Sequence, residues 1–186
     1  MKRVPAALFM VMLLVVPVVC GCGNNTGEAK ERISEADARW DDLSKNLTVA
    51  SVQVLSAVYS MLEGNDAAVG VEDLAANMAV LEEAALLIED LRLDYEQVQQ
   101  MEGAPGYSEY ASVMIEAINA SQMAASATAA FTALVLEPAA IGDIAGLNAV
   151  IARQMAQLEE IRRLQGEADQ ALAGAERIKQ ERKLAD

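Results

Sequence analysis

The chain has 186 residues, of which 53 % are hydrophobic but only 4 % are aromatic. Its core must therefore be built from Ala, Leu, Val, Ile and Met, which is typical of packed helices rather than of a β-sandwich. The net charge of −14 argues against binding to nucleic acid, because the phosphate backbone would repel it.

Residues 1–21 have the layout of a secretory signal peptide. Lys2 and Arg3 precede an apolar run at 6–19, which small residues follow. As a helix this run would rise only about 21 Å, less than the ~30 Å hydrocarbon core of a bilayer. We therefore expect a cleaved leader and not a permanent membrane span.

Residues 19–22 read Val-Cys-Gly-Cys and resemble the lipobox of bacterial lipoproteins, in which an aliphatic residue and two small ones precede a modified cysteine. This resemblance covers only the leader. It implies cleavage before Cys22, a diacylglycerol on its sulfur and often an acyl chain such as palmitate on its amino group. Cys20 is the competing site, but Val18 and Val19 before it are too bulky. Two acyl chains anchor a protein stably, so we expect Cys22 to hold the chain on the extracytoplasmic side of a membrane.

Without the leader the chain keeps 12 basic and 28 acidic residues, a net charge of −16. Residues 22–27 are polar and contain glycine, so they are predicted to form a short tether. Residues 28–186 are long enough for one domain with a continuous core.

Turn-forming residues at 64–66, 103–106 and 137–138 divide this domain into four segments. Thr26, Asp66 and Ser108 are candidate helix caps. The junction at 138–146 is open to three interpretations: a loop, a 3₁₀ turn or the start of the fourth helix. The four helices are predicted at about 28–63, 66–102, 106–136 and 141–184.

Apolar side chains recur along each segment in steps of three and four, which is a heptad seam. Each helix must bury its seam, and short links make neighbours antiparallel. The predicted fold is all-α, a long antiparallel up-down four-helix bundle. On the fourth segment the seam positions are Ile144, Leu147, Ile151, Met155, Leu158, Ile161, Gln165, Ala168, Leu172, Ala175 and Ile178.

Catalytic chemistry has few candidate groups in this sequence. There is no histidine, and acylation would occupy Cys22, the sole cysteine of the mature chain. This excludes His-based nucleophilic catalysis and thiolate metal sites, so we expect no catalytic residue, no metal site and no cofactor. Carboxylates at 82–83, 89–90 and 94–96 are predicted to form a solvated face; the alternatives are a weak cation site or a docking surface for a basic partner.

Methionines and aromatic residues are predicted mainly to fill the core. The alternatives are soft-metal binding by the methionines, and a ligand cavity lined by the aromatic residues. The residues are Met61, Met78, Met101, Met114, Met123, Met155, Trp40, Tyr59, Tyr95, Tyr107 and Tyr110.

Residues 117–136 contain no charge, and within them Ala120, Ser121, Ala124 and Ala125 place small side chains along one side of the helix. These four are the candidate interface residues. The segment is predicted to be a central helix with close packing. An interface for another protein or another copy is the alternative, because the segment is too polar for a membrane span.

Basic residues are predicted to gather in the half of the bundle that holds both termini. They either pair with acids such as Glu31, Glu35, Glu176 and Glu181 or attract anionic lipid headgroups. The basic residues are Lys30, Arg32, Arg39, Lys45, Arg162, Arg163, Arg177, Lys179, Arg182 and Lys183.

The predicted function is that of a noncatalytic envelope lipoprotein whose helical bundle binds other proteins, or copies of itself, at the membrane surface. The alternative is an extracytoplasmic small-ligand sensor or solute-binding module, since the architecture resembles the sensor domains of chemotaxis receptors. An enzyme is a third and weaker interpretation.

Overall fold

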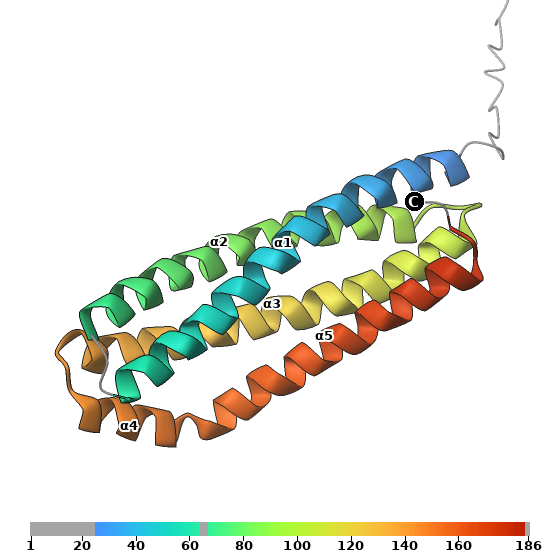
Figure 1. The fold of residues 1–186 in the computed structure, drawn as a ribbon. Helices are drawn as coiled ribbons and strands as arrows, with labels where there is room; N and C mark the ends of the chain where they lie inside the picture. The colour runs from blue at the N-terminus through green and yellow to red at the C-terminus, as the bar shows by residue number, and fades with distance from the viewer. Residues whose placement is uncertain (1–24, 64–66, 185–186) are drawn as a thin grey trace, which may run out of the picture.

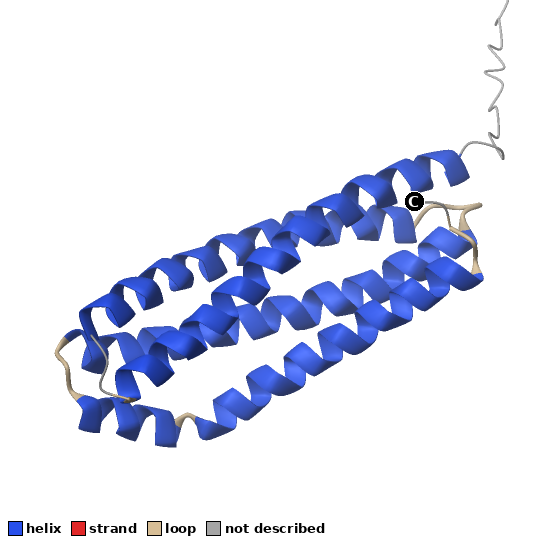
Figure 2. Ribbon diagram, viewed as in Figure 1, coloured by secondary structure: helices blue, strands red, loops and turns tan. Residues whose placement is uncertain are grey.

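The computed structural model describes residues 25–63 and 67–184. Within these ranges the chain is helical apart from short turns, and none of the described residues is in a strand (Figure 2). The predicted all-α class is confirmed. The helices are α1 (Asn25–Leu62), α2 (Ala67–Gln99), α3 (Pro105–Ala140), α4 (Ile144–Arg153) and α5 (Met155–Glu181).

The long helices lie side by side in an elongated bundle (Figure 1). α2 packs along both α1 and α3, and α3 packs along α5. α3 also contacts α1, so it is the central helix of the described part of the chain. α4 contacts α1, α3 and α5 near the end of the bundle where α1 ends.

Aliphatic side chains and a few aromatic rings form the core. Every seam position predicted on the first segment is buried. These positions are Ile33, Ala36, Trp40, Leu43, Leu47, Ala50, Val54, Ala57 and Met61. The buried hydroxyls of Thr128 and Thr132 each donate to the carbonyl four residues before them, both at 2.8 Å. Among the described residues no buried side-chain nitrogen or oxygen lacks a partner, so burial leaves no polar group unpaired.

The first helix starts earlier than predicted. α1 begins at Asn25, so residues 25–27, expected in the tether, are helical. The Asn25 Nδ2 donates to the carbonyl of Glu102 at 2.7 Å, and the Thr26 hydroxyl donates to that of Gly103 at 3.3 Å. These bonds hold the first turn of α1 against the turn between α2 and α3. Thr26 is thus inside the helix and does not cap it.

The predicted cap at Ser108 is also wrong. α3 begins at Pro105, whose fixed φ and missing N–H suit the first helical position, and the N-cap residue Ala104 makes no side-chain capping bond. The Ser108 hydroxyl instead donates to the carbonyl of Gln99 at 2.7 Å. The predicted leader, Cys20, Cys22 and Asp66 lie outside the described residues.

The third helix was predicted to stop before Pro138, but α3 continues to Ala140. Pro138 lies in the last turn, where its missing N–H removes a single helical bond. The turn after it is a Schellman motif with Gly142 at φ 68°. Gly142 N–H donates to the carbonyl of Ala139 at 3.0 Å, and Asp143 N–H to that of Pro138 at 2.9 Å.

The fourth predicted helix is two helices, α4 and α5, separated by Gln154. The Asp143 side chain caps α4 by accepting from Gly146 N–H at 2.9 Å. α4 buries Leu147 completely under the end of the bundle. With the break at Gln154, α4 contacts α1 and α3 at the end of the bundle, while α5 packs along α3.

Candidate functional site

The side of the bundle between α1 and α5 is open. No Cα of α1 lies within 8 Å of a Cα of α5 in the described part of the chain, whereas α1–α2, α2–α3 and α3–α5 all pack closely. Two hollows lie along this side, with α3 as their floor. Both are lined by Ser51 of α1 and Gln165 of α5, so they adjoin there, and we call the two hollows together the α1/α5 groove.

The hollow nearer to Asn25, the Trp40 hollow, has a volume of about 110 Å³. Its walls carry hydroxyls and an amide, and its floor consists of small side chains. The lining residues are Trp40, Ser44, Leu47, Thr48, Ser51, Ser121, Ala124, Ala125, Gln165, Ala168, Asp169 and Leu172.

The hollow nearer to α4, the Tyr59 hollow, is larger, about 160 Å³, and more apolar. Leu55, Tyr59 and Met155 at its rim are 40, 62 and 50 % exposed, which leaves three large apolar side chains in contact with water. The lining residues are Ser51, Leu55, Val58, Tyr59, Thr128, Phe131, Ile151, Met155, Leu158, Glu159, Ile161, Arg162 and Gln165.

The groove explains why the predicted seam of the fourth segment is incomplete. Ile144, Met155 and Gln165 were predicted to be buried, but all three are exposed. Met155 and Gln165 face the groove, because α1 does not close over that side of α5. The heptad pattern identified the inward face of α5. It could not show that no neighbouring helix covers part of this face.

The four candidate interface residues all lie on α3, but they line two different hollows between α3 and its neighbours. Ser121, Ala124 and Ala125 form the floor of the Trp40 hollow, and the two alanines are only 5 and 3 % exposed. Ala120 is half-buried and lines instead a separate hollow between α3 and α5, together with Gly174. Small side chains on α3 thus give the groove its depth.

A polar cluster that the sequence did not reveal joins all four long helices beside the Trp40 hollow. Asp37 of α1 accepts hydrogen bonds at Oδ1 from the hydroxyls of Tyr95 (2.7 Å) and Tyr110 (2.8 Å). Its Oδ2 accepts from Lys179 Nζ at 3.3 Å, and this ammonium lies 6.0 Å from the centre of the Tyr110 ring. We call these four residues the Asp37 cluster.

The Asp37 cluster keeps its two phenols protonated. Burial raises the pKa of Tyr95 far above its usual value, and the negative charge of Asp37 and its hydrogen bond raise it further. The pKa of Tyr110 is raised for the same reasons in the same order. Neither phenol is therefore a base or a nucleophile near neutral pH. The arrangement is suited to holding helices together.

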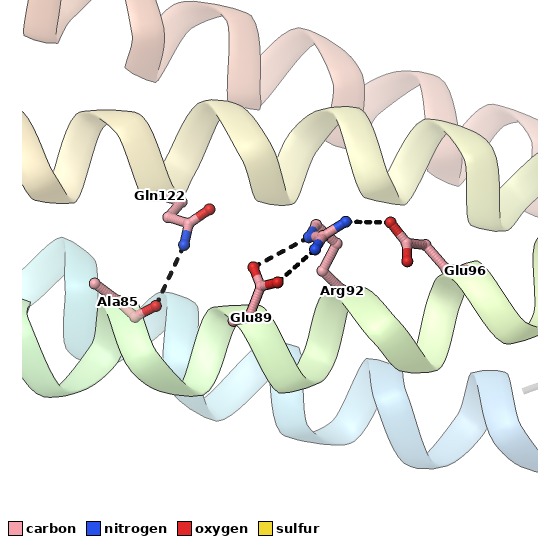
Figure 3. Close-up of polar contacts among 5 residues, drawn as sticks. All are labelled: Ala85, Glu89, Arg92, Glu96 and Gln122. Atoms are coloured by element: carbon pink, nitrogen blue, oxygen red, sulfur yellow. Dashed lines mark hydrogen bonds and ion pairs between the residues drawn. The ribbon is translucent and has the colours of Figure 1, made fainter.

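Two carboxylates of α2, Glu89 and Glu96, pair with one arginine. No cluster of three metal-binding side chains occurs among the described residues. Arg92 lies between Glu89 and Glu96 on the side of α2 that faces α3, where Gln122 donates to the carbonyl of Ala85 at 3.4 Å (Figure 3). The hydrogen bond from Arg92 lowers the pKa of Glu89.

The remaining carboxylates of this strip divide between solvent and α1. Glu82, Glu83 and Asp90 are exposed, while Asp94 pairs with Arg39 of α1. The strip is therefore partly a solvated face, as predicted, and partly a helix–helix contact.

The methionines and aromatic residues divide between core and surface. Met61, Met114, Trp40, Tyr95, Tyr107 and Tyr110 are buried, whereas Met123, Met155 and Tyr59 are exposed. The prediction that they fill the core is thus wrong for Met123, Met155 and Tyr59. Met155 and Tyr59 line the groove.

The basic residues do pair with nearby acids along one helix, as predicted: Arg32 with Glu28 and Arg163 with Glu160. The prediction did not include the pairs that join different helices. These are Arg39 with Asp94, Lys179 with Asp37, and Arg182 with Glu109 at 2.8 Å. Arg162 was misplaced: it lines the Tyr59 hollow, near the end of the bundle where α1 ends.

α3 is the one described helix that is long and apolar enough to cross a membrane, and 44 % of its most apolar stretch is buried by the other helices. A core helix has the same properties. Comparisons with family models, curated proteins and solved structures give no match to this chain.

Proposed function

We propose that this protein is a lipid-anchored envelope protein whose helical bundle binds a partner protein in the α1/α5 groove. We further propose that α1, α2, α3 and α5 form an antiparallel up-down bundle. The observation that supports the function is the open side between α1 and α5, where exposed Leu55, Tyr59 and Met155 surround a hollow. Exposed apolar side chains around a concavity are typical of interaction sites.

The size of the hollows favours a protein partner over a small solute. Pockets for small ligands usually enclose about 300–1,000 Å³. The Trp40 hollow has about 110 Å³ and the Tyr59 hollow about 160 Å³. Each suits one inserted side chain, which is how a partner protein anchors itself to a surface.

The start of α1 is compatible with an anchor at Cys22. Only two residues separate Cys22 from Asn25, where α1 begins. The bonds from Asn25 and Thr26 to the turn at 102–103 fasten this end of α1 to the bundle. A lipid on Cys22 would therefore hold this end of the bundle next to the bilayer and leave the side of the groove accessible.

Photocrosslinking in intact membranes tests this proposal. A photoreactive amino acid at Tyr59 should give a discrete crosslinked protein, whereas the same group at exposed Leu86 on α2 should not. Ser51→Phe, which places a ring where the two hollows meet, should abolish the product. Ser56→Phe, at an exposed position of α1 outside both hollows, should not.

Equal crosslinking at residues 59 and 86 would contradict the proposal. So would a product from position 59 that persists in a folded Ser51→Phe variant. In either case the groove would not be the binding surface.

A further inference from the structure

We propose that the occupant of the α1/α5 groove is one amphipathic helix of a partner protein. This helix carries two large apolar anchors seven to eleven residues apart, with Lys or Arg beside them. The inference rests on the proposed function, because it names the class of partner for the same groove.

The spacing of the anchors follows from the walls of the groove. On α1 the Trp40 hollow extends over residues 40–51 and the Tyr59 hollow over residues 51–59. On α5 the corresponding stretches are 165–172 and 155–165. The midpoints of the two stretches are about nine residues apart on each wall, which is about 14 Å along a helix. Side chains at i and i+7, or at i and i+11, bracket this distance on one face of a docked helix.

The shape of the groove fits a helix better than an extended peptide. An extended peptide that binds as an added strand needs the exposed edge of a sheet, and no described residue of this chain is in a strand. Two helical walls over a floor of Ser121, Ala124 and Ala125 offer the kind of groove that receives an amphipathic helix.

The charge around the groove indicates a basic partner. Glu159 and Asp169 line it, and Arg162 is the single cation among the lining residues. Two carboxylates thus stand against one guanidinium among the lining residues, in a chain whose net charge is −14. Lys and Arg next to the anchors would complement this potential and speed up association.

A second copy of this chain does not fit this charge. The proposed mature form carries 12 basic and 28 acidic residues, so two copies would each bring a charge of −16 to the contact. Their fields would repel each other at the ionic strength at which a basic helix is attracted.

Binding of designed peptides to the full lipidated chain in zwitterionic nanodiscs tests the inference. Three helical peptides share two Leu anchors at i and i+7 and differ only in flanking Lys, Gln or Glu. The chain has one tryptophan, Trp40, which lines a hollow, so its fluorescence reports occupancy of the groove by peptides without Trp. We expect the Lys peptide to bind roughly tenfold more tightly than the Gln peptide, with a salt-dependent affinity, and the Glu peptide to bind weakest.

Variants of the chain locate the site. Ser51→Phe and Gln165→Phe, which block the groove from opposite walls, should abolish binding of the Lys peptide, while Ser56→Phe should not. The double variant Glu159→Lys/Asp169→Lys should weaken binding roughly tenfold. Its control, Glu82→Lys/Glu83→Lys, makes the same change in net charge at exposed positions of α2 and should change the affinity much less.

Several results would overturn the inference. Equal affinity for the three peptides would refute the basic partner. A dimer of the full chain that Ser51→Phe dissociates would show that the groove binds a second copy. A fatty acid that displaces the Lys peptide would show that the groove binds a lipid. If no peptide binds but Ser51→Phe still abolishes crosslinking in membranes, the helical partner is wrong and the proposed function survives. If Ser51→Phe leaves that crosslink intact, the proposed function fails as well.

Discussion

Asp37 connects the four long helices through a single carboxylate. Two phenols donate to one of its oxygens and the Lys179 ammonium to the other. Tyr95 is fully buried, so its hydroxyl has no water to replace a lost acceptor. An unpaired buried donor is costly, and these bonds therefore favour the one arrangement of helices that satisfies them all.

Replacing Asp37 by Ala should lower the free energy of unfolding by about 3 kcal/mol, because two phenols and an ammonium lose their acceptor together. Urea denaturation followed by circular dichroism measures this. Asp42→Ala is the matched control: Asp42 faces only Lys45, at 3.8 Å, and its side chain is 86 % exposed. It should change stability by less than about 0.5 kcal/mol. Similar losses for the two variants would mean that the Asp37 cluster does not stabilise the fold.

The same cluster predicts that stability falls in alkaline solution. Tyr95 and Tyr110 have raised pKa values in the folded protein, so above about pH 10 the unfolded chain binds fewer protons than the folded one. The contribution of these phenols is thus complete below pH 10. It declines above that pH by up to about 1.4 kcal/mol per pH unit for each tyrosine.

Chemical denaturation between pH 8 and pH 11 measures the decline. The double variant Tyr95→Phe/Tyr110→Phe should be less stable at pH 8 but should lose stability less steeply above pH 10. Parallel curves for the variant and the unchanged chain would contradict the assignment.

At the scale of the helices, every seam position predicted on α1 is buried, whereas the seam predicted on α5 is only partly buried. A seam shows which side chains prefer to leave water, and it does not show which helix covers them. Met155 and Gln165 occupy seam positions and still face the groove. For the same reason the Asp37 cluster was not predictable: Asp37 is next to seam residue Ala36, and its partners follow only from the alignment of α1 with three other helices.

Helix ends differ from the predicted ones for a local reason. Proline disrupts helix interiors, so Pro138 predicts a break, but in a last turn its cost is a single hydrogen bond. The actual stop is at Gly142, whose positive φ closes a Schellman turn. α5 ends in the same way with Lys183 at φ 51°, where Lys183 N–H donates to the carbonyl of Gln180 and Leu184 N–H to that of Lys179.

The two Schellman turns predict opposite effects for substitutions at their left-handed residues, because glycine is favoured at both. Lys183→Gly should raise the free energy of unfolding by about 0.5–1 kcal/mol, since glycine adopts positive φ without steric cost. Gly142→Ala should lower it by about 1 kcal/mol for the converse reason. Lys183→Ala is the control for charge, because it removes the ammonium but keeps a Cβ. Equal stability of Lys183→Gly and Lys183→Ala would show that the left-handed conformation carries no strain.

At the scale of the whole molecule, ion pairs between helices help to align the bundle. Arg39 with Asp94, Lys179 with Asp37 and Arg182 with Glu109 join α1 to α2, α1 to α5 and α3 to α5. All three lie toward the end that carries Asn25. The other end relies on apolar packing under α4, where Leu147 is fully buried. Charge asymmetry in the sequence therefore reflects contacts between helices and gives no independent evidence for lipid headgroups.

In the proposed function, a lipid on Cys22 sets how this asymmetric molecule is held at a membrane. A diacylglycerol thioether needs the cysteine sulfur, so Cys22→Ser should move the protein from the detergent phase to the aqueous phase or leave an uncleaved precursor. Cys20→Ser should still partition into detergent, because Val18 and Val19 make Cys20 a poor site. Loss of anchoring from Cys20→Ser alone would reassign the lipid. With the anchor at Cys22, Tyr59 lies about 51 Å along α1 from Asn25. The Tyr59 hollow would then meet a partner well above the bilayer, so a soluble Cys22→Ser chain should bind the basic helical peptide as tightly as the lipidated chain does.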